Sequence, residues 1–256
     1  MELWRKKFAM LAAEFLGTGF LTLVVLAVQR STIGVPYFVA IAAGFAVAAL
    51  MYVFSNVSGA HLNPLVTIGL WSARKVKTIP AALYLIVQVL GGWAAYGVYT
   101  YFVNSSLPLL NGHITSHLYV AEGVGAFVFA FVWAAAAARR LSHAVAGVGF
   151  AVGIIIAAAA SVGIINPALA LGERAWVFWG STGWIVYVLA PVIGGIVGFN
   201  LYDLIFGDAR SWSLAKVGVG TRKPAASTTA AKSTASKSTA AKSKTTARKT
   251  TAKKRK

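Results

Sequence analysis

Six apolar runs, each long enough to cross a membrane, restrict this chain to a narrow set of folds. They cover about residues 8–28, 36–54, 80–103, 119–138, 143–165 and 183–206. A hydrocarbon core of about 30 Å takes about 20 helical residues. Only 12% of the residues are charged, too few to cover a soluble protein of this length. The sequence therefore predicts an all-α membrane protein with six transmembrane helices.

The positively charged residues between these runs indicate which way the chain crosses the membrane. Nine of them lie before the first run, between the second and third, between the fourth and fifth, or after the sixth. These nine are Arg5, Lys6, Lys7, Arg74, Lys75, Lys77, Arg139, Arg140 and Arg210. The opposite side carries only Arg30 and Arg174. Because Lys and Arg accumulate on the cytoplasmic side, we expect cytoplasmic N- and C-termini in a cell (plasma or inner) membrane.

The two halves of the chain, about 8–103 and 119–206, repeat each other in order. The matching segments are AEFLG at 13–17 with AEGVG at 121–125, GFAVA at 44–48 with GFAVG at 149–153, and QVLGG at 88–92 with PVIGG at 191–195. Asn63-Pro64 likewise recurs as Asn166-Pro167. Each half contains three spans, an odd number, so the second half must enter the membrane inverted. Inverted 3+3 repeats place their functional site at the repeat interface, near the bilayer midplane.

The two Asn-Pro pairs interrupt apolar sequence with the signal for a helix start. Asn is a favoured N-cap and Pro a favoured first helical residue. The pairs therefore predict short helices, from Asn63 to about Trp71 and from Asn166 to about Arg174, each about 15 Å long or half a membrane. Two such helices entering from opposite faces would meet at their N-termini. That meeting point would repel cations and offer amide donors to neutral polar molecules.

These motifs resemble those of the aquaporins, the major intrinsic protein family. The segments that carry the resemblance are AEFLGT (13–18), SGAHLNPLVT (58–67), QVLGG (88–92), INPA (165–168) and APVIGG (190–195). The resemblance implies six helices and two re-entrant half-helices around a passive pore, in a homotetramer in the lipid bilayer, with no enzymatic activity, cofactor or metal. Its pore motifs would be Asn63, Pro64 and Leu65, and Asn166, Pro167 and Ala168. Leu65 departs from the family, which usually has Ala there.

A larger departure lies at the expected selectivity filter. By the family's spacing, the four filter positions are Ala43, Ile154, Gly163 and Leu169, and the family usually has Arg at the last of these. Here all four are apolar and two are very small. Arg174 lies about 140° around the half-helix from Leu169, so it cannot replace the missing Arg. The hypothesis is a wide apolar filter that passes water, or small neutral solutes such as glycerol, urea or ammonia.

Two acids and one histidine stand out within the apolar segments. Glu14 and Glu122 occupy matching repeat positions, and an intramembrane carboxylate is a candidate for a proton relay. The resemblance implies instead that each carboxylate braces a pore loop, and this is the reading we favour. His61 resembles the family's loop histidine and would border the pore on the cytoplasmic side, as a weak candidate for pH gating.

The last segment, residues 215–256, differs in composition from the predicted channel domain, residues 1–214. It holds 13 of the 24 Lys and Arg residues, no acid and no aromatic residue. Such a segment cannot bury a core, so we expect a disordered cytoplasmic tail. The tail could bind anionic lipid or nucleic acid, or remain passive.

Two other functions stay open beside the passive channel. The chain could be a membrane anchor whose basic tail makes the contacts while the pore is vestigial. It could also be a coupled secondary transporter, since such carriers use inverted repeats and broken helices. The transporter is less favoured, because the breaks offer only Asn side chains and carbonyls for ion coordination.

Overall fold

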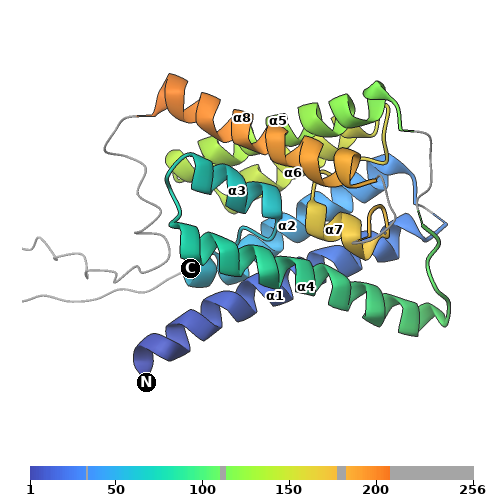
Figure 1. Cartoon of the computed structure of the whole chain (residues 1–256), viewed down its shortest axis with the longest axis horizontal. Coiled ribbons are helices and arrows are strands. Elements are labelled where there is room, and N and C mark those ends of the chain that lie inside the picture. Colours follow the sequence, from blue (N-terminus) through green and yellow to red (C-terminus); the bar gives the residue numbers. More distant parts are fainter. Residues whose placement is uncertain (33, 110–113, 178–182, 208–256) are drawn as a thin grey trace, which may run out of the picture. The chain divides into compact units, whose positions relative to one another are not determined.

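The computed structural model describes residues 1–32, 34–109, 114–177 and 183–207 (Figure 1). All of these residues belong to one compact unit. The predicted tail, 215–256, and the predictions about its binding lie outside the described residues.

Every regular element in the described ranges is a helix. They are α1 (Glu2–Gln29), α2 (Pro36–Ser58), α3 (Pro64–Ser72), α4 (Thr78–Val103), α5 (Ser116–Ala138), α6 (His143–Ala157), α7 (Pro167–Gly172), η1 (Ile185–Leu189) and α8 (Ala190–Phe206). Helices α1, α2, α4 and α5, and η1 continued by α8, are long and apolar enough to span a membrane, and α6 is a shorter apolar helix. The predicted all-α, multi-pass membrane architecture is confirmed.

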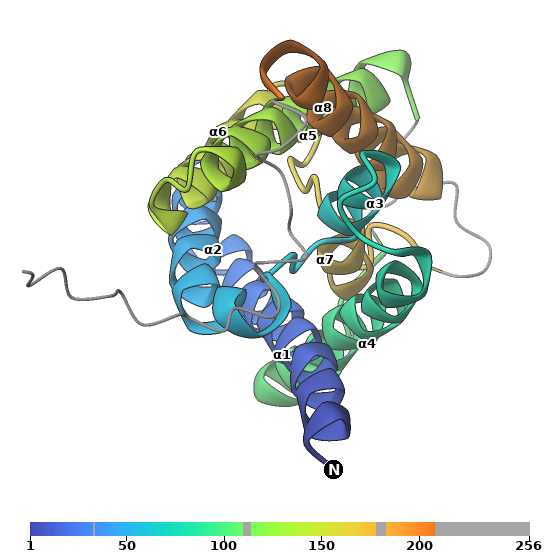
Figure 2. The ribbon, with the colours of Figure 1, turned by 90° about the vertical axis from the view of Figure 1, so that its left-hand side faces the viewer.

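The helix packing follows the internal repeat. In the first half α1 packs against α2 and α4, and in the second half α5 packs against α6 and α8. The halves join where α2 meets α6. The short helices cross between halves, because α3 packs against α8 and α7 packs against α4. Figure 2 shows the long helices arranged around α3 and α7, and Figure 1 shows the two short helices meeting end to end.

The predicted fifth span, 143–165, is wrong at its C-terminal end. Helix α6 ends at Ala157, and residues 158–165 form the loop that leads into α7. The backbone N–H groups of Gly163, Ile164 and Ile165 donate to the Glu122 carboxylate instead of to helical carbonyls. Apolar composition alone could not show this, since the loop is as hydrophobic as the helix before it.

The second half-helix is also shorter than predicted, ending at Gly172 rather than near Arg174. Arg174 has a φ of +59°. The N–H of Ala175 then reaches the carbonyl of Ala170 at 2.9 Å, and the N–H of Arg174 reaches that of Leu171 at 3.1 Å. This pair of bonds is a Schellman-type helix end. It places Glu173 at the last turn of α7.

The last predicted span contains one wide helical turn. Pro191 has no N–H, so it cannot donate to the carbonyl four residues earlier. The helix forms a π turn over Ile185–Leu189, in which the N–H of Ala190 donates to the carbonyl of Ile185. A π turn beside a proline is a common way to accommodate the missing donor.

Close helix contact at Gly92 supports one stability prediction. A Cβ added at Gly92 of α4 would collide with the carbonyl oxygen of Ala168 in α7, whereas a Cβ at Gly97 of the same helix meets nothing within 4 Å. We expect Gly92→Ala to destabilise the protein by about 1–3 kcal/mol through overpacking. The matched variant Gly97→Ala should be neutral or stabilising, because Ala is the better helix former. Thermal unfolding in detergent measures both, and equal Tm values for the two variants would contradict the prediction.

Candidate functional site

The two Asn-Pro pairs lie against each other where α3 and α7 begin. The Asn63 side-chain oxygen accepts from the N–H of Leu65 at 2.9 Å, and that of Asn166 accepts from Ala168 at 3.0 Å. Both asparagines therefore cap their own helices, and Pro64 and Pro167 follow as the first helical residues. Leu65 and Ala168, the third residues of the two motifs, are fully buried.

Each asparagine also donates across the repeat interface. The Asn63 amide nitrogen donates to the carbonyl of Ile165 at 3.1 Å, and the Asn166 amide nitrogen donates to the carbonyl of Leu62 at 3.0 Å. The sequence alone predicts that the amide N–H groups of each asparagine point into the lumen. In the structure one N–H of each amide fixes the opposite loop, which leaves one N–H on each for a permeant.

The two acceptor carbonyls belong to residues with strained backbones. Leu62 has a φ of +53° and Ile165 a φ of +42°, values that are uncommon for non-glycine residues and a clear outlier for β-branched Ile. The preceding repeat pair, Ala60 and Gly163, also has positive φ, at +49° and +77°. Strain of this kind persists only where surrounding contacts hold it. The two loops thus share one unusual backbone path, which turns each carbonyl toward the opposite asparagine.

Glu14 connects α1 to the first of these loops. Its side chain is fully buried, and its Oε1 accepts from the Ser58 hydroxyl at 2.6 Å and the N–H of His61 at 3.0 Å. Its Oε2 accepts from the N–H of Leu62 at 2.8 Å and from the Gln88 amide at 2.9 Å. Four donors therefore converge on one carboxylate, and one of them is the N–H of the strained residue before Asn63.

Glu122 makes the matching connection from α5 to the second loop. Its Oε1 accepts from the Ser161 hydroxyl at 2.8 Å and from the N–H of Gly163 at 3.0 Å. Its Oε2 accepts from the N–H of Ile165 at 2.8 Å, and the N–H of Ile164 lies within bonding distance of both oxygens. Four donors therefore converge on this carboxylate as well, and three of them are consecutive backbone N–H groups of the loop.

The sequence reasoning missed the side chains that complete these networks. Ser58 and Ser161 occupy matching repeat positions, each five residues before its Asn, so a full comparison of the two loops would have found them. Gln88 aligns with Pro191, and only the first loop gains an amide. Gln88 donates to Thr67 as well as to Glu14, at 2.9 Å in each case.

His61 lies within this first network. Its Nδ1 is 3.0 Å from the Thr67 hydroxyl, and its side chain is 6% exposed. The rings of Tyr84 and Trp133 approach it edge to face, with centroids at 5.1 and 6.3 Å. The imidazole is thus enclosed by aromatic rings and held by a hydroxyl.

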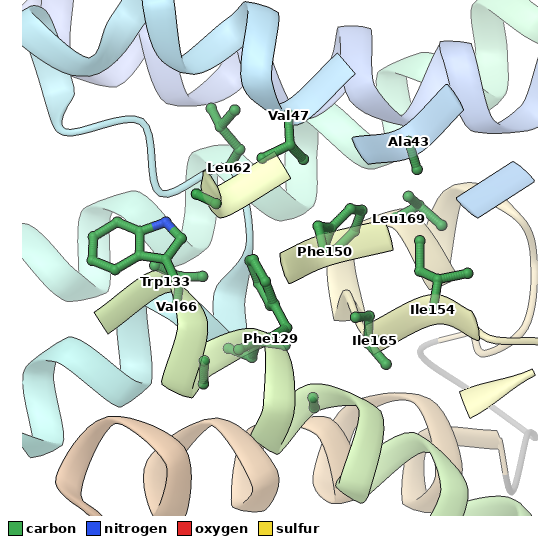
Figure 3. Close-up of a cluster of buried hydrophobic side chains, with 14 of the residues drawn as sticks. Ala43, Val47, Leu62, Val66, Phe129, Trp133, Phe150, Ile154, Ile165 and Leu169 are labelled. Carbon is green, nitrogen blue, oxygen red and sulfur yellow. The ribbon is translucent and has the colours of Figure 1, made fainter. Parts of the chain in front are cut away.

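The expected filter positions come together from three helices. Figure 3 shows Ala43 of α2 and Ile154 of α6 pointing toward Leu169 of α7. All three side chains are at most 1% exposed. Gly163 adjoins this group, because a Cβ added there would lie 2.7 Å from the carbonyl oxygen of Ile154. The four positions therefore lie close together, and none of them carries a charged side chain.

Arg174 points away from these four positions, as the helical geometry predicts. Its Nη1 is 3.4 Å from the Tyr96 hydroxyl and 3.4 Å from the carbonyl of Leu107, and its guanidinium lies over the Tyr96 ring. Arg174 therefore ties the end of α7 to α4 and the following loop.

Comparison with known proteins supports the assignment that this geometry suggests. The family model described as Major intrinsic protein matches residues 2–202. Aquaporin Z of Photorhabdus laumondii is 29% identical over 228 residues, which cover 77% of this chain and 97% of the relative. Aquaporin PIP1-1 of Arabidopsis thaliana is 33% identical over 210 residues, which cover 69% of this chain and 73% of the relative. The solved structure of the aquaglyceroporin from Plasmodium falciparum matches with a TM-score of 0.61 at 24% identity, over 78% of this chain and 96% of that chain. The chain therefore belongs to the major intrinsic protein family, whose aquaporins are passive membrane channels for water or small solutes rather than enzymes.

Proposed function

We propose that this channel passes water and also neutral solutes larger than water, such as glycerol, urea or ammonia, through a wide apolar filter. The observation that carries the proposal is the cluster of Ala43, Ile154, Gly163 and Leu169, which holds no charged group and includes two very small residues. A ring without donors gives water no advantage over less polar molecules.

The Asn pair supports selection for neutral permeants at the next point along the pore. Asn63 and Asn166 each keep one free amide N–H after binding the opposite loop. A pair of neutral donors suits the oxygen of water, an alcohol or an amide, and it gives a cation no ligand. The proposal therefore keeps one barrier to cations while removing the one that an Arg at position 169 would supply.

We propose that the two buried glutamates brace the pore loops and that His61 lies beside the pore. Glu14 and Glu122 use their carboxylate oxygens to accept loop N–H groups, including those of the strained Leu62 and Ile165. This use of the lone pairs favours a structural role over proton transfer. It also favours a passive channel over a coupled transporter, since the carboxylates of Glu14 and Glu122 are already occupied by loop donors.

A panel of solutes in proteoliposomes tests the proposed filter. After osmotic shrinkage in glycerol, urea or sucrose, we expect vesicles with the channel to reswell in glycerol and urea and to stay shrunken in sucrose. Stopped-flow light scattering measures both phases, and empty vesicles give the lipid background. Fast water flow with glycerol and urea excluded as fully as sucrose would overturn the wide filter. The membrane-anchor alternative predicts no flow above background for any of them.

Three further features complete the proposal. We place the N- and C-termini in the cytoplasm on the charge distribution between loops, and we propose a homotetramer with one pore per subunit on the family resemblance. The segment 215–256 lies beyond the family match, which ends at residue 202. Its positive charge supports contact with a polyanionic surface, either lipid or nucleic acid.

A further inference from the structure

One acid near the filter has no role in the loops, the helix caps or the Asn pair. Glu173 follows α7, and its N–H donates to the carbonyl of Leu169 at 2.9 Å. It therefore lies one helical turn beyond the filter position, on the side away from the Asn pair. Its side chain is fully buried. A buried acid without a structural task is a candidate for binding a ligand.

Glu173 lines a cavity that adjoins the filter. The cavity has a volume of about 160 Å³ and is lined by Gln29, Gly34, Pro36, Val39, Val162, Gly163, Ile164 and Glu173. Gly163 belongs to the filter itself, and Val39 lies one turn before Ala43 on α2. The space is larger than one water molecule needs. The cavity thus lies beside the filter position Gly163 and has room for a small solute.

Several polar atoms around this cavity have no partner. Within the described residues, the carboxylate oxygens of Glu173, the Oε1 of Gln29, and the Nε and Nη2 of Arg30 accept or donate no hydrogen bond of good geometry. Glu173 and Gln29 line the cavity, and Arg30 follows Gln29 in the chain; the Gln29 side chain and the charge of Arg30 both act on the Glu173 carboxylate. Gln29 is the last residue of α1 and Arg30 caps that helix, so α1 and α7 present these groups from two elements. Leaving buried polar atoms unpaired costs stability. Natural proteins keep such groups where a ligand or water satisfies them.

The unpaired groups form a mixed set of donors and acceptors. Arg30 supplies donors, and the Gln29 oxygen is an acceptor. Burial raises the pKa of the Glu173 carboxyl to about 8, although Gln29 and the charge of Arg30 oppose the shift and the charge of Glu122 adds to it. Glu173 lies outside the membrane-spanning helices. Near neutral pH most of this carboxyl is protonated, so it can donate one hydrogen bond and accept others.

We propose that Glu173, Gln29 and Arg30 form a binding site for the permeant beside the filter, which takes a small neutral molecule with adjacent hydrogen-bond donors and acceptors, such as a polyol or an amide. This inference rests on the proposed passage of solutes larger than water. The hydrogen bonds that select such solutes would then be made at this site, one helical turn away from the apolar filter position Leu169. A solute bound there exchanges its water for protein partners before it enters a ring that offers none.

Infrared difference spectra of the reconstituted channel test binding without relying on flux. Acetamide or glycerol is added, with sucrose at equal osmolality as the control, and the carboxyl bands are followed. We expect a saturable shift of one carboxyl band with both probes and none with sucrose. The shift should be absent in Glu173→Gln and Glu173→Leu, and it should persist in Arg174→Gln, whose side chain faces Tyr96 instead.

Flux measurements on the same variants show whether the site serves permeation. Glu173→Leu should raise the half-saturating concentration for glycerol flux at least about tenfold, because its hydrogen bonds to the solute are lost. Arg174→Gln, the matched control at the neighbouring position, should keep the half-saturating concentration of the unsubstituted protein. Glu173→Leu removes unpaired buried atoms, so we expect it to fold and to have an equal or higher Tm.

The outcomes separate this site from the proposed filter. Carboxyl bands that do not respond to acetamide or glycerol mean that the cavity holds water only, and they overturn the site whatever the flux is. The same holds for a response that survives in Glu173→Leu, since it then belongs to another carboxyl. A Glu173-dependent band shift without solute flux supports the site and contradicts the filter. Solute flux without a band shift contradicts the site and supports the filter.

Discussion

Replacing Glu122 with alanine is expected to lower the free energy of unfolding by about 3–5 kcal/mol and to abolish channel activity. The change removes the acceptor for the Ser161 hydroxyl and for three consecutive backbone N–H groups, residues 163–165. A buried donor without a partner costs about 1–3 kcal/mol. Relaxation of the loop recovers part of that cost. The loop also loses the contact that holds Ile165 at positive φ, so its carbonyl would no longer face Asn63.

Thermal unfolding in detergent and water permeability in vesicles measure the two effects. Glu122→Gln keeps one acceptor oxygen but turns an NH₂ group toward loop N–H donors, so we expect a smaller loss of stability with the same direction. Glu2→Gln is the control, because Glu2 makes only an exposed ion pair with Lys6, of a kind worth about 0–1 kcal/mol. A Tm for Glu122→Ala equal to that of the control would show that the carboxylate does not hold the loop.

Leu169→Arg is expected to reduce glycerol permeability at least about tenfold while water permeability is retained. The change puts a long, charged side chain into the buried cluster of Ala43, Ile154, Gly163 and Leu169, the proposed filter. The added volume narrows the ring. Differences of this size between permeants are typical when a pocket loses the space of a methylene or more. The guanidinium also restores donors that water can use.

Two more variants make the test of the filter independent of the new charge. Ala43→Phe narrows the same ring without a charge, so it should also exclude glycerol if size sets the limit. Phe45→Ala is the control on the same helix, because Phe45 is 72% exposed and faces away from the ring. Stopped-flow reswelling in glycerol compares all three. If both ring variants pass glycerol as the control does, the constriction lies elsewhere in the pore.

The helices and the starts of the half-helices could be predicted because their signals are local. Pro64 and Pro167, each after an Asn, mark helix starts through properties of those residues alone, and the structure begins α3 and α7 there. The end of α6 could not be predicted from the run 143–165. The groups that end it are on Glu122, about 40 residues away, and no local pattern in an apolar run reveals a distant acceptor.

The sequence predicted which residues belong to the candidate site, but it did not predict the hydrogen bonds between them. The internal repeat identified Asn63, Asn166, Glu14 and Glu122. The family's spacing identified the four filter positions: Figure 3 shows Ala43, Ile154 and Leu169 near one another, and Gly163 lies next to Ile154. The crossed bonds between each asparagine and the opposite loop join residues 102 and 104 positions apart. Pairing over such a distance depends on how the two halves dock.

The amino-acid sequence by itself determined that this chain is an inverted repeat of membrane helices with two Asn-capped half-helices, because hydrophobic length, helix capping and repetition are properties of neighbouring residues. Only the tertiary structure decided which groups are left unpaired. Glu173 is an ordinary acid in the sequence, and nothing near it predicts burial. It becomes a candidate binding group because α7 packs against α1, so that Glu173 and Gln29 line one cavity beside the filter position Gly163. Burial and partnering belong to the packed fold, since they depend on what every other element leaves uncovered.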